Sequence, residues 1–309
     1  MIDVIGAPFD LCGRRVGSRL GPAALRLAGL VDTLKALGLD VRDVGDSVAP
    51  TESTDDDGIR NFRPLVECIT SLRSMVYRSL SEGHVPIVMG GEHTLVAAGI
   101  SAALELFGGD LGLLWIDAHA DIHTPGSSAT GNVHGMPVAA LAGMASDTIG
   151  KKDEEWRLLL GSLGTGPKLD LHKTAWYGLR DVDTPERSRL VGLPVSMNKI
   201  DRLGIEPTAT SLDRWFRQQG VRNLWISFDV DVLDPILAPG TGTAVRGGLT
   251  YREAHLLAEL IREALDSADR PYRLVGVDLV ETNPLYDTHN QTALMAVEWL
   301  ASLFGKTIL

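Results

Sequence analysis

The run LGLLWIDAHAD, residues 111–121, decides the fold class of this chain. It begins with a short apolar segment of the length of a buried strand and ends in Asp117, His119 and Asp121. Because these three residues are spaced two apart, an extended chain points all three side chains to one side. The run therefore predicts a strand that delivers two carboxylates and an imidazole to one place.

Four further runs have the same design, an apolar segment that ends in polar, ionisable residues. In an open parallel sheet, the residues that follow the carboxyl ends of the strands converge on one edge, where ligands bind. The sequence therefore predicts an α/β fold in which five polar clusters meet at one rim. The four runs are VPIVMGGEH (85–93), TAWYGLRDVD (174–183), RNLWISFDVD (222–231) and RLVGVDLVETN (273–283).

The first part of the chain alternates strand and helix patterns, as expected of β-α units with a mainly parallel sheet. Residues 2–8, IDVIGAP, form a predicted strand. One predicted helix covers residues 21–38, with Pro22 near its first turn and Gly38 at its end. Residues 39–46 follow as a second strand.

Longer helical patterns occupy the rest of the chain. Residues 59–83 predict an amphipathic helix with a break near Pro64. We interpret the irregular stretch 146–167 as an insertion, and we expect residues 1–309 to form a single catalytic domain. Four more helices are predicted over residues 94–108, 206–220, 250–269 and 292–305.

The composition narrows the class of protein. The chain has 309 residues with a formal charge of −11, which disfavours binding to the phosphates of nucleic acid and suits small cationic ligands better. Cys12 and Cys68 form neither a disulfide framework nor a thiolate zinc pattern. The chain start lacks the pattern of a secretory signal, and no apolar run is long enough to cross a bilayer. We therefore expect a cytoplasmic protein that binds no membrane.

A second two-apart motif strengthens the case for a metal site. Asp229 and Asp231 close their strand as Asp117 and Asp121 do, and four carboxylates held close together would be neutralised by two divalent cations. His93, after another strand, supplies a further nitrogen ligand. Either motif alone fits a solvated loop or a helix cap, but their joint occurrence at strand ends argues against that reading.

The types of ligand indicate which metal binds. Four Asp and two His favour a hard or borderline ion such as Mn²⁺ over the cysteine-bound zinc of structural sites. The same ligand types also accept Co²⁺, Ni²⁺ or Fe²⁺. Two ions that share a water would lower its pKa, so that hydroxide exists near neutral pH.

With these motifs in order, the chain resembles the arginase, or ureohydrolase, family nearly from end to end. This resemblance implies a three-layer α/β/α sandwich on a mainly parallel sheet. The matching stretches are GGEHTL (90–95), DAHADIHTPGSSATGNVHG (117–135), GLRDVD (178–183), SFDVDVLDP (227–235), GTGTAVRGGLTYREA (240–254) and GVDLVETNP (276–284).

The resemblance also implies roles for residues at the metal site. Asp117 and Asp229 would bridge two manganese ions, Glu281 would bind the guanidinium group, and His134 would shuttle protons between the site and solvent. A metal-bridging hydroxide would attack the guanidinium carbon, and Asp121 would deliver a proton to the leaving nitrogen. The implied ligands are His93, Asp117, Asp121 and Asp229 for one ion, and His119, Asp117, Asp229 and Asp231 for the other.

Substrate contacts follow from the same resemblance. The loop 123–132 resembles the arginase segment that receives the α-carboxylate of the amino acid, which implies contacts from His123, Thr130 and Asn132. Asp183 would receive the α-amino group, Glu186 would contact it through water, and Thr243 would line the pocket. Four positions depart from the usual family residues: Glu92, His123 and Thr130 replace Asp, Asn and Ser, and Pro185 replaces Gly.

Hydrolysis of L-arginine to L-ornithine and urea is the favoured function. The alternatives are another ureohydrolase, namely an agmatinase, a guanidinobutyrase or a formimidoylglutamase, and a noncatalytic metal-binding regulatory protein of the same fold. Arg252 and Glu253 lie in a segment that resembles one used in family subunit contacts. We therefore expect a homotrimer or a homohexamer.

Overall fold

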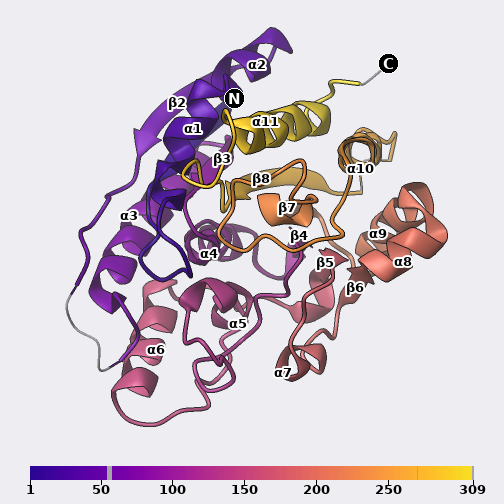
Figure 1. Ribbon diagram of the computed structural model, residues 1–309. Coiled ribbons are helices and arrows are strands. Elements are labelled where there is room, and N and C mark those ends of the chain that lie inside the picture. The colour runs from indigo at the N-terminus through magenta and orange to yellow at the C-terminus, as the bar shows by residue number, and fades with distance from the viewer. Residues whose placement is uncertain (54–57, 270, 308–309) are drawn as a thin grey trace.

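The core of the molecule is an eight-stranded sheet with the strand order β2-β1-β3-β8-β7-β4-β5-β6 (Figure 1). The structure is a computed structural model that describes residues 1–53, 58–269 and 271–307. All neighbouring strands of the sheet pair in parallel. The strands are β1 (Ile2–Ala7), β2 (Val41–Asp46), β3 (Val85–Gly90), β4 (Leu111–Ile116), β5 (Thr174–Leu179), β6 (Leu193–Ser196), β7 (Asn223–Asp229) and β8 (Arg273–Val280).

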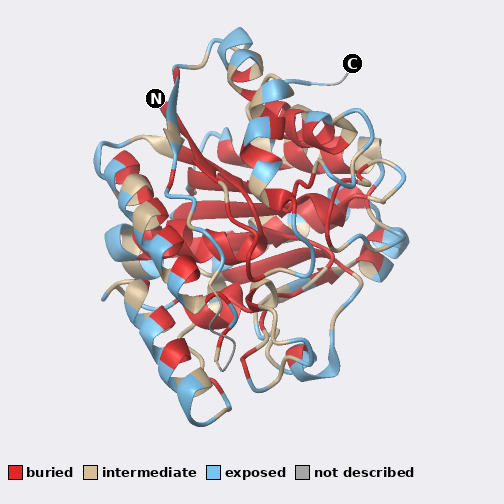
Figure 2. Cartoon of the chain, turned by 60° about the vertical axis from the view of Figure 1, so that its left-hand side comes forward, coloured by how far each residue is buried: buried red, intermediate tan, exposed pale blue. Residues whose placement is uncertain are grey.

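Helices cover both faces of the sheet, and two separate hydrophobic clusters fill the spaces between the layers (Figures 1 and 2). Helices α1, α2 and α8 to α11 pack on one face, and α3 to α6 pack on the other. No helix in the described ranges is both long enough and apolar enough to cross a membrane. The helices are α1 (Gly21–Leu27), α2 (Leu30–Ala36), α3 (Phe62–Ser81), α4 (Val96–Phe107), α5 (Pro137–Leu141), α6 (Lys151–Ser162), α7 (Thr184–Arg187), α8 (Met197–Leu203), α9 (Ile205–Gln218), α10 (Tyr251–Leu265) and α11 (Gln291–Leu303).

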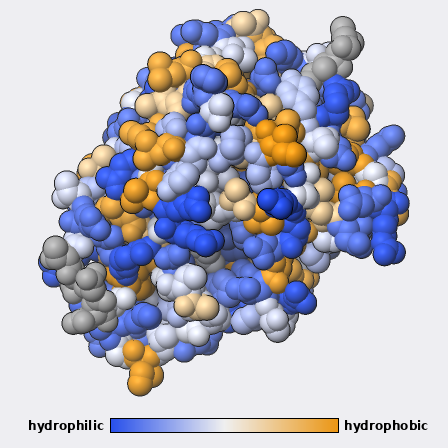
Figure 3. Space-filling model, in the orientation of Figure 1, coloured by the Kyte–Doolittle hydropathy of each residue, from blue (hydrophilic) through white to orange (hydrophobic). Residues whose placement is uncertain are grey.

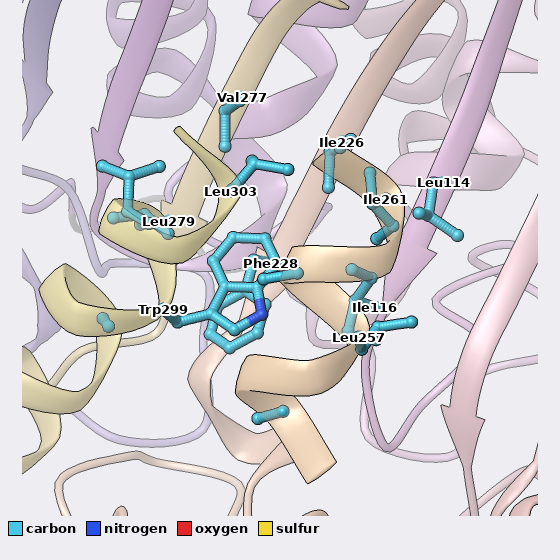
Figure 4. Close-up of a cluster of buried hydrophobic side chains, with 14 of the residues drawn as sticks. Leu114, Ile116, Ile226, Phe228, Leu257, Ile261, Val277, Leu279, Trp299 and Leu303 are labelled. Atoms are coloured by element: carbon cyan, nitrogen blue, oxygen red, sulfur yellow. The ribbon is translucent and has the colours of Figure 1, made fainter. Parts of the chain in front are cut away.

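Aromatic packing joins the central strand β7 to the last helix. The rings of Phe228 and Trp299 stack with centroids 3.9 Å apart, and both side chains are buried (Figure 4). Leucine and isoleucine side chains from β4, β8 and α10 surround the pair (Figure 4). Such a buried aromatic pair contributes about 0.5–1.5 kcal/mol beyond the area that it buries.

The structure confirms the three-layer α/β/α sandwich, and the sheet is parallel throughout. The single helix predicted over residues 21–38 is wrong. Gly29 takes a left-handed φ of 82°, which ends α1 and starts α2. Pro64 causes no break, because it occupies the first turn of α3, where a backbone N–H has no helical partner.

Two further elements differ from the sequence-based expectation. The stretch 146–167 is not irregular, because it contains the 12-residue helix α6. This helix is rich in charged residues and buries few side chains, chiefly Trp156 and Leu159, so its apolar period is weak in the sequence. The short strand β6 was not predicted; it lies at the edge of the sheet, and of its four residues only Val195 is buried.

Glycine at position 276 makes room for a buried tryptophan of the neighbouring strand. Trp225 on β7 pairs with Gly276 on β8, and a Cβ at position 276 would meet the Trp225 ring at 2.1–2.6 Å. We expect Gly276→Ala to lower the free energy of unfolding by about 1–3 kcal/mol, because the indole must shift in a packed core. Urea denaturation followed by circular dichroism measures this change.

The matched control is Gly161→Ala, at a helical position where an added Cβ meets nothing within 4 Å. Its stability should be unchanged or slightly higher. Equal stability of the two variants would contradict the expectation.

Candidate metal centre

Five strands that are adjacent in the sheet carry the polar clusters. In the order β3, β8, β7, β4 and β5, each strand ends at the same edge of the sheet and is followed by candidate site residues. Each of the five clusters contributes residues to the wall of a cavity of about 380 Å³ at this edge. On the face of the molecule shown in Figure 3, hydrophilic residues predominate and hydrophobic ones occur in small separate groups. The predicted convergence of the five runs is therefore present in the structure.

The first cluster gathers three carboxylates around one imidazole. The Nδ1 atom of His93 lies 3.0 Å from Oδ2 of Asp121, 3.1 Å from Oδ2 of Asp117 and 3.2 Å from Oδ2 of Asp229. All four side chains are buried. They come from the ends of β3, β4 and β7, so the sheet order brings them together.

A second cluster shares Asp117 with the first. The Nδ1 atom of His119 lies 3.3 Å from Oδ1 of Asp117 and 3.0 Å from Oδ2 of Asp231. Asp117 thus directs one oxygen to each imidazole, as a bridging ligand must. Asp229 faces the first cluster with Oδ2, while its Oδ1 accepts the backbone N–H of Asp231. The bridging role of Asp229 stays a prediction.

The hydrogen bonds of His93 test whether these residues fit a cation. Its Nε2 lies 2.9 Å from the hydroxyl of Ser227, which donates at 2.5 Å to the buried carboxylate of Asp278. Because the Ser227 proton is given to Asp278, Nε2 of His93 must carry the ring proton and donate it to Ser227. The Nδ1 atom then directs its lone pair at three carboxylates, and within the described residues it makes no hydrogen bond of good geometry. The lone pair and the three carboxylates repel one another unless a positive charge lies between them. The residues therefore fit a metal ion.

The pKa shifts within the cluster also indicate a cation site. Burial and neighbouring carboxylates raise the pKa of Asp121, Asp229 and Asp231. Burial opposes a charged imidazole at His93, but the three facing carboxylates raise its pKa well above the ordinary value, so that without an ion the ring takes up a second proton at Nδ1, the position that a cation would fill. The cluster therefore has more negative charge than its own side chains neutralise, as expected of a site for divalent cations.

Glu281 and His134 lie side by side next to the first cluster. Oε1 of Glu281 accepts the backbone N–H of His93 at 2.9 Å and lies 3.3 Å from Nδ1 of His134. Burial lowers the pKa of His134, but Glu281 raises it to a net value above the ordinary one. Glu281 has a φ of 61° and Asp121 a φ of 49°, a backbone strain that is typical of functional sites.

Two of the four departures from the family pattern have clear surroundings. Glu92 is buried beside His93, and its oxygens accept the backbone N–H of Cys12 at 2.9 Å and the hydroxyl of Thr94 at 2.7 Å. Burial raises the pKa of Glu92 to about 7. Pro185 lies in the first turn of α7, where proline is well tolerated.

One group of residues in the cavity wall can donate hydrogen bonds. Thr130 and Asn132 line the cavity, and Oδ1 of Asn132 accepts a hydrogen bond of 2.8 Å from the Arg60 guanidinium. This bond leaves the amide NH₂ of Asn132 free to donate to a ligand. Thr243 lines another part of the cavity and donates to Oδ2 of Asp231 at 2.7 Å.

A second group in the cavity wall, called the acidic end below, consists of acidic residues. Asp183 and Glu186 line the cavity, but the two oxygens of Glu186 accept the backbone N–H groups of Ile122 at 3.1 Å and of Asp183 at 3.0 Å. Glu186 is buried and therefore acts at least as an anchor of the backbone. The Nε2 atom of His123 lies 3.1 Å from Oδ2 of Asp183, so this imidazole belongs to the acidic end.

Sequence reasoning missed several residues around the site. Ser227 and Asp278 orient His93, and a single acidic residue inside the apolar run VGVDLV was the available signal for Asp278. Arg14 and Asp181 also line the cavity. Arg14 lies seven residues beyond the end of β1, too far from the strand for a strand-end pattern to point to it.

Comparison with known proteins agrees with this geometry. The Arginase family matches residues 1–305 of the chain. The arginase of Staphylococcus aureus (strain COL) is 35% identical, in an alignment that covers 100% of this chain and 98% of that protein. The structure of the arginase from Bacillus caldovelox superposes with a TM-score of 0.88 at 32% identity and covers 100% of this chain and 99% of that one. Proclavaminate amidino hydrolase from Streptomyces clavuligerus has a TM-score of 0.71 at 26% identity, with coverage of 98% and 90%. The resemblance inferred from the motifs is confirmed: the chain belongs to the arginase family of hydrolases.

Proposed function

We propose that the chain hydrolyses L-arginine to L-ornithine and urea at a pair of manganese ions. The observation that carries this proposal is the pair of His–Asp clusters that share Asp117. Glu281 lies beside them, where a carboxylate can hold a guanidinium group by charge-assisted hydrogen bonds. The proposed ligands of the two ions are His93, Asp117, Asp121, Asp229, His119 and Asp231.

The chemistry divides between the ions and the chain. Bound divalent ions would activate a water molecule for attack on the guanidinium carbon. Glu281, fixed through the backbone N–H of His93, would hold that carbon in place. We assign Asp121 to proton delivery to the leaving nitrogen and His134 to proton exchange with solvent, because both line the cavity and His134 lies 3.3 Å from Glu281.

The two ends of the cavity favour an amino acid substrate. Thr130 and Asn132, with the cationic Arg14, can receive an α-carboxylate. Asp183, with Asp181 close by in sequence and also in the cavity wall, can receive an α-ammonium group. Arginine carries both groups, whereas agmatine lacks the carboxylate and guanidinobutyrate lacks the amine.

Further parts of the proposal concern the whole molecule. We propose that residues 1–309 form a single catalytic domain that acts in the cytoplasm. We also propose a homotrimer or homohexamer, with Arg252 and Glu253 in the contact between subunits. Near-complete coverage of both chains in the arginase alignments supports the single domain.

A substrate panel tests the proposed reaction. Purified protein supplied with Mn²⁺ should release urea from L-arginine with a kcat/KM at least about tenfold above that for agmatine or 4-guanidinobutyrate, because each lacks one recognised charge. Formamide release from N-formimino-glutamate should be absent. A preference for agmatine would exclude the arginase assignment, and two bound ions without turnover of any of these compounds would favour a noncatalytic binding protein.

Removal of a single carboxylate tests the metal centre. Asp231→Ala should lose at least one of two manganese ions per chain and most urea production, because the second cluster retains only Asp117 and His119. Elemental analysis after gel filtration measures the metal content. Asp40→Ala, at an exposed position outside the cavity, is the matched control and should keep both ions. Full metal content and activity in Asp231→Ala would refute the ligand assignment.

Glu281→Gln separates substrate binding from metal binding. Glutamine can still accept the backbone N–H of His93, but it lacks the charge that attracts a guanidinium group. We expect kcat/KM for arginine to fall by about 10²–10³ while the manganese content stays the same. Loss of metal in this variant would show instead that Glu281 maintains the metal centre.

A further inference from the structure

We propose that His123 sets the specificity for the amine end of the substrate, and that Arg189 holds it in position through Ser127. The inference rests on the proposed function, because it concerns how the chain positions Asp183, the residue that would bind the α-ammonium group of an amino acid. The guanidinium group of Arg189 links the end of α7 to the beginning of the loop 123–132.

Arg189 lies just after α7 and clamps this loop from outside the cavity. Its Nη1 donates to the carbonyl oxygen of Ile122 at 2.8 Å and to the hydroxyl of Ser127 at 3.1 Å. Its Nη2 donates to Asp147 at 3.1 Å and reaches the hydroxyl of Thr124 at 3.4 Å. One planar group thus fixes three points of the segment 122–127, a task that suits the rigid fork of arginine.

The hydroxyl of Ser127 connects Arg189 to His123 through hydrogen bonds. Its oxygen accepts from Arg189 at 3.1 Å and from the backbone N–H of Thr124 at 2.9 Å, which occupies both lone pairs. The hydroxyl of Thr124 lies farther away, at 3.2 Å, and gives its proton to Asp147 at 2.8 Å. The Ser127 proton is therefore available for donation. Nδ1 of His123, at 3.1 Å, is a closer acceptor than the carbonyl oxygen of Thr124, at 3.3 Å.

The orientation of His123 follows from that donation. Because Nδ1 accepts from Ser127, Nε2 carries the ring proton and donates it to Asp183 at 3.1 Å. The side chain of His123 is 12% exposed and that of Asp183 is 66% exposed. A largely buried, clamped ring therefore holds an exposed carboxylate that also takes part in the capping box of α7, and this order lowers the entropic cost of binding an ammonium group.

The two ends of the substrate pocket have separate anchors. Within the loop 123–132, all of which the structure describes, the Arg189 guanidinium bonds Thr124 and Ser127 only, whereas the amide of Asn132 is fixed by Arg60 at 2.8 Å. A change at Arg189 or Ser127 should therefore affect amine recognition, and a change at Arg60 should affect carboxylate recognition. This separation provides a matched control.

Three substrates and four variants test the inference. The substrates are L-arginine, agmatine, which lacks the carboxylate, and 5-guanidinopentanoate, which lacks the amine. In Ser127→Ala and Arg189→Met we expect KM to rise roughly tenfold for arginine and agmatine, with kcat and the rate on 5-guanidinopentanoate within about twofold of wild type. Arg60→Met should show the opposite pattern, with arginine and 5-guanidinopentanoate weakened and agmatine unaffected. Ser127→Thr, which keeps a hydroxyl, should restore the wild-type KM.

A binding measurement keeps the inference separate from the proposed reaction. By calorimetry, L-ornithine should bind Ser127→Ala and Arg189→Met roughly tenfold more weakly than wild type, whereas 5-aminopentanoic acid, which has an unbranched chain and no α-amino group, should bind all three alike. Equal losses for all substrates, or a fall in kcat alone, would show that Arg189 and Ser127 serve only stability and would overturn the inference. If wild type binds ornithine with the expected pattern but turns over no guanidino compound, the proposed function fails and the inference stands.

Discussion

The structure depends on the concentration of negative charge at one edge of the sheet. Four buried aspartates surround His93 and His119, and the chain itself supplies too little positive charge to balance them. Burying unpaired carboxylates costs several kcal/mol each, so cations bound at this edge would stabilise the arrangement. The hydrogen bonds from His93 through Ser227 to Asp278 also indicate a cation site. They turn a nitrogen lone pair of His93 toward the carboxylates, where it can bind a metal ion.

The sheet topology explains how residues so distant in sequence meet. Strands β3 and β4 are consecutive in the chain, but β8 and β7 are inserted between them in the sheet. Each of these four central strands therefore ends beside another that carries a polar cluster, and β5 adds a fifth. Helices on both faces keep the strands buried, so the carboxyl edge is where polar groups can gather without breaking the apolar layers.

The sequence predicted the location of the site better than its fine structure. The two-apart spacing at strand ends pointed to Asp117, Asp121, Asp229 and Asp231, but the extended backbone assumed for it is wrong beyond the strands. The chain bends at residues 117–119, Asp121 has a φ of 49°, and Asp231 lies in a 3-10 turn over Val230–Val232. The spacing does not identify contacts that depend on loops, such as the reach of Arg189 across the segment 122–127. Likewise, a lone glycine inside a helical pattern does not reveal whether it adopts the left-handed conformation that separates α1 from α2, since tertiary packing decides this.

Backbone strain and charge repulsion at the site are both compensated by the surrounding structure. Asp121 and Glu281 adopt positive φ angles, and hydrogen bonds hold both: the carbonyl of Asp121 accepts the N–H of Val138 at 3.0 Å, and the N–H of Glu281 donates to Gly91 at 2.8 Å. These costs are present in the folded chain whether or not an ion is bound, whereas the attraction to an ion acts only when the clusters are assembled. Metal affinity and folding stability are therefore linked, because an ion that binds only the folded clusters stabilises the fold by its own binding free energy. The same carboxylates that make the metal-free protein less stable are thus the reason that it selects divalent cations.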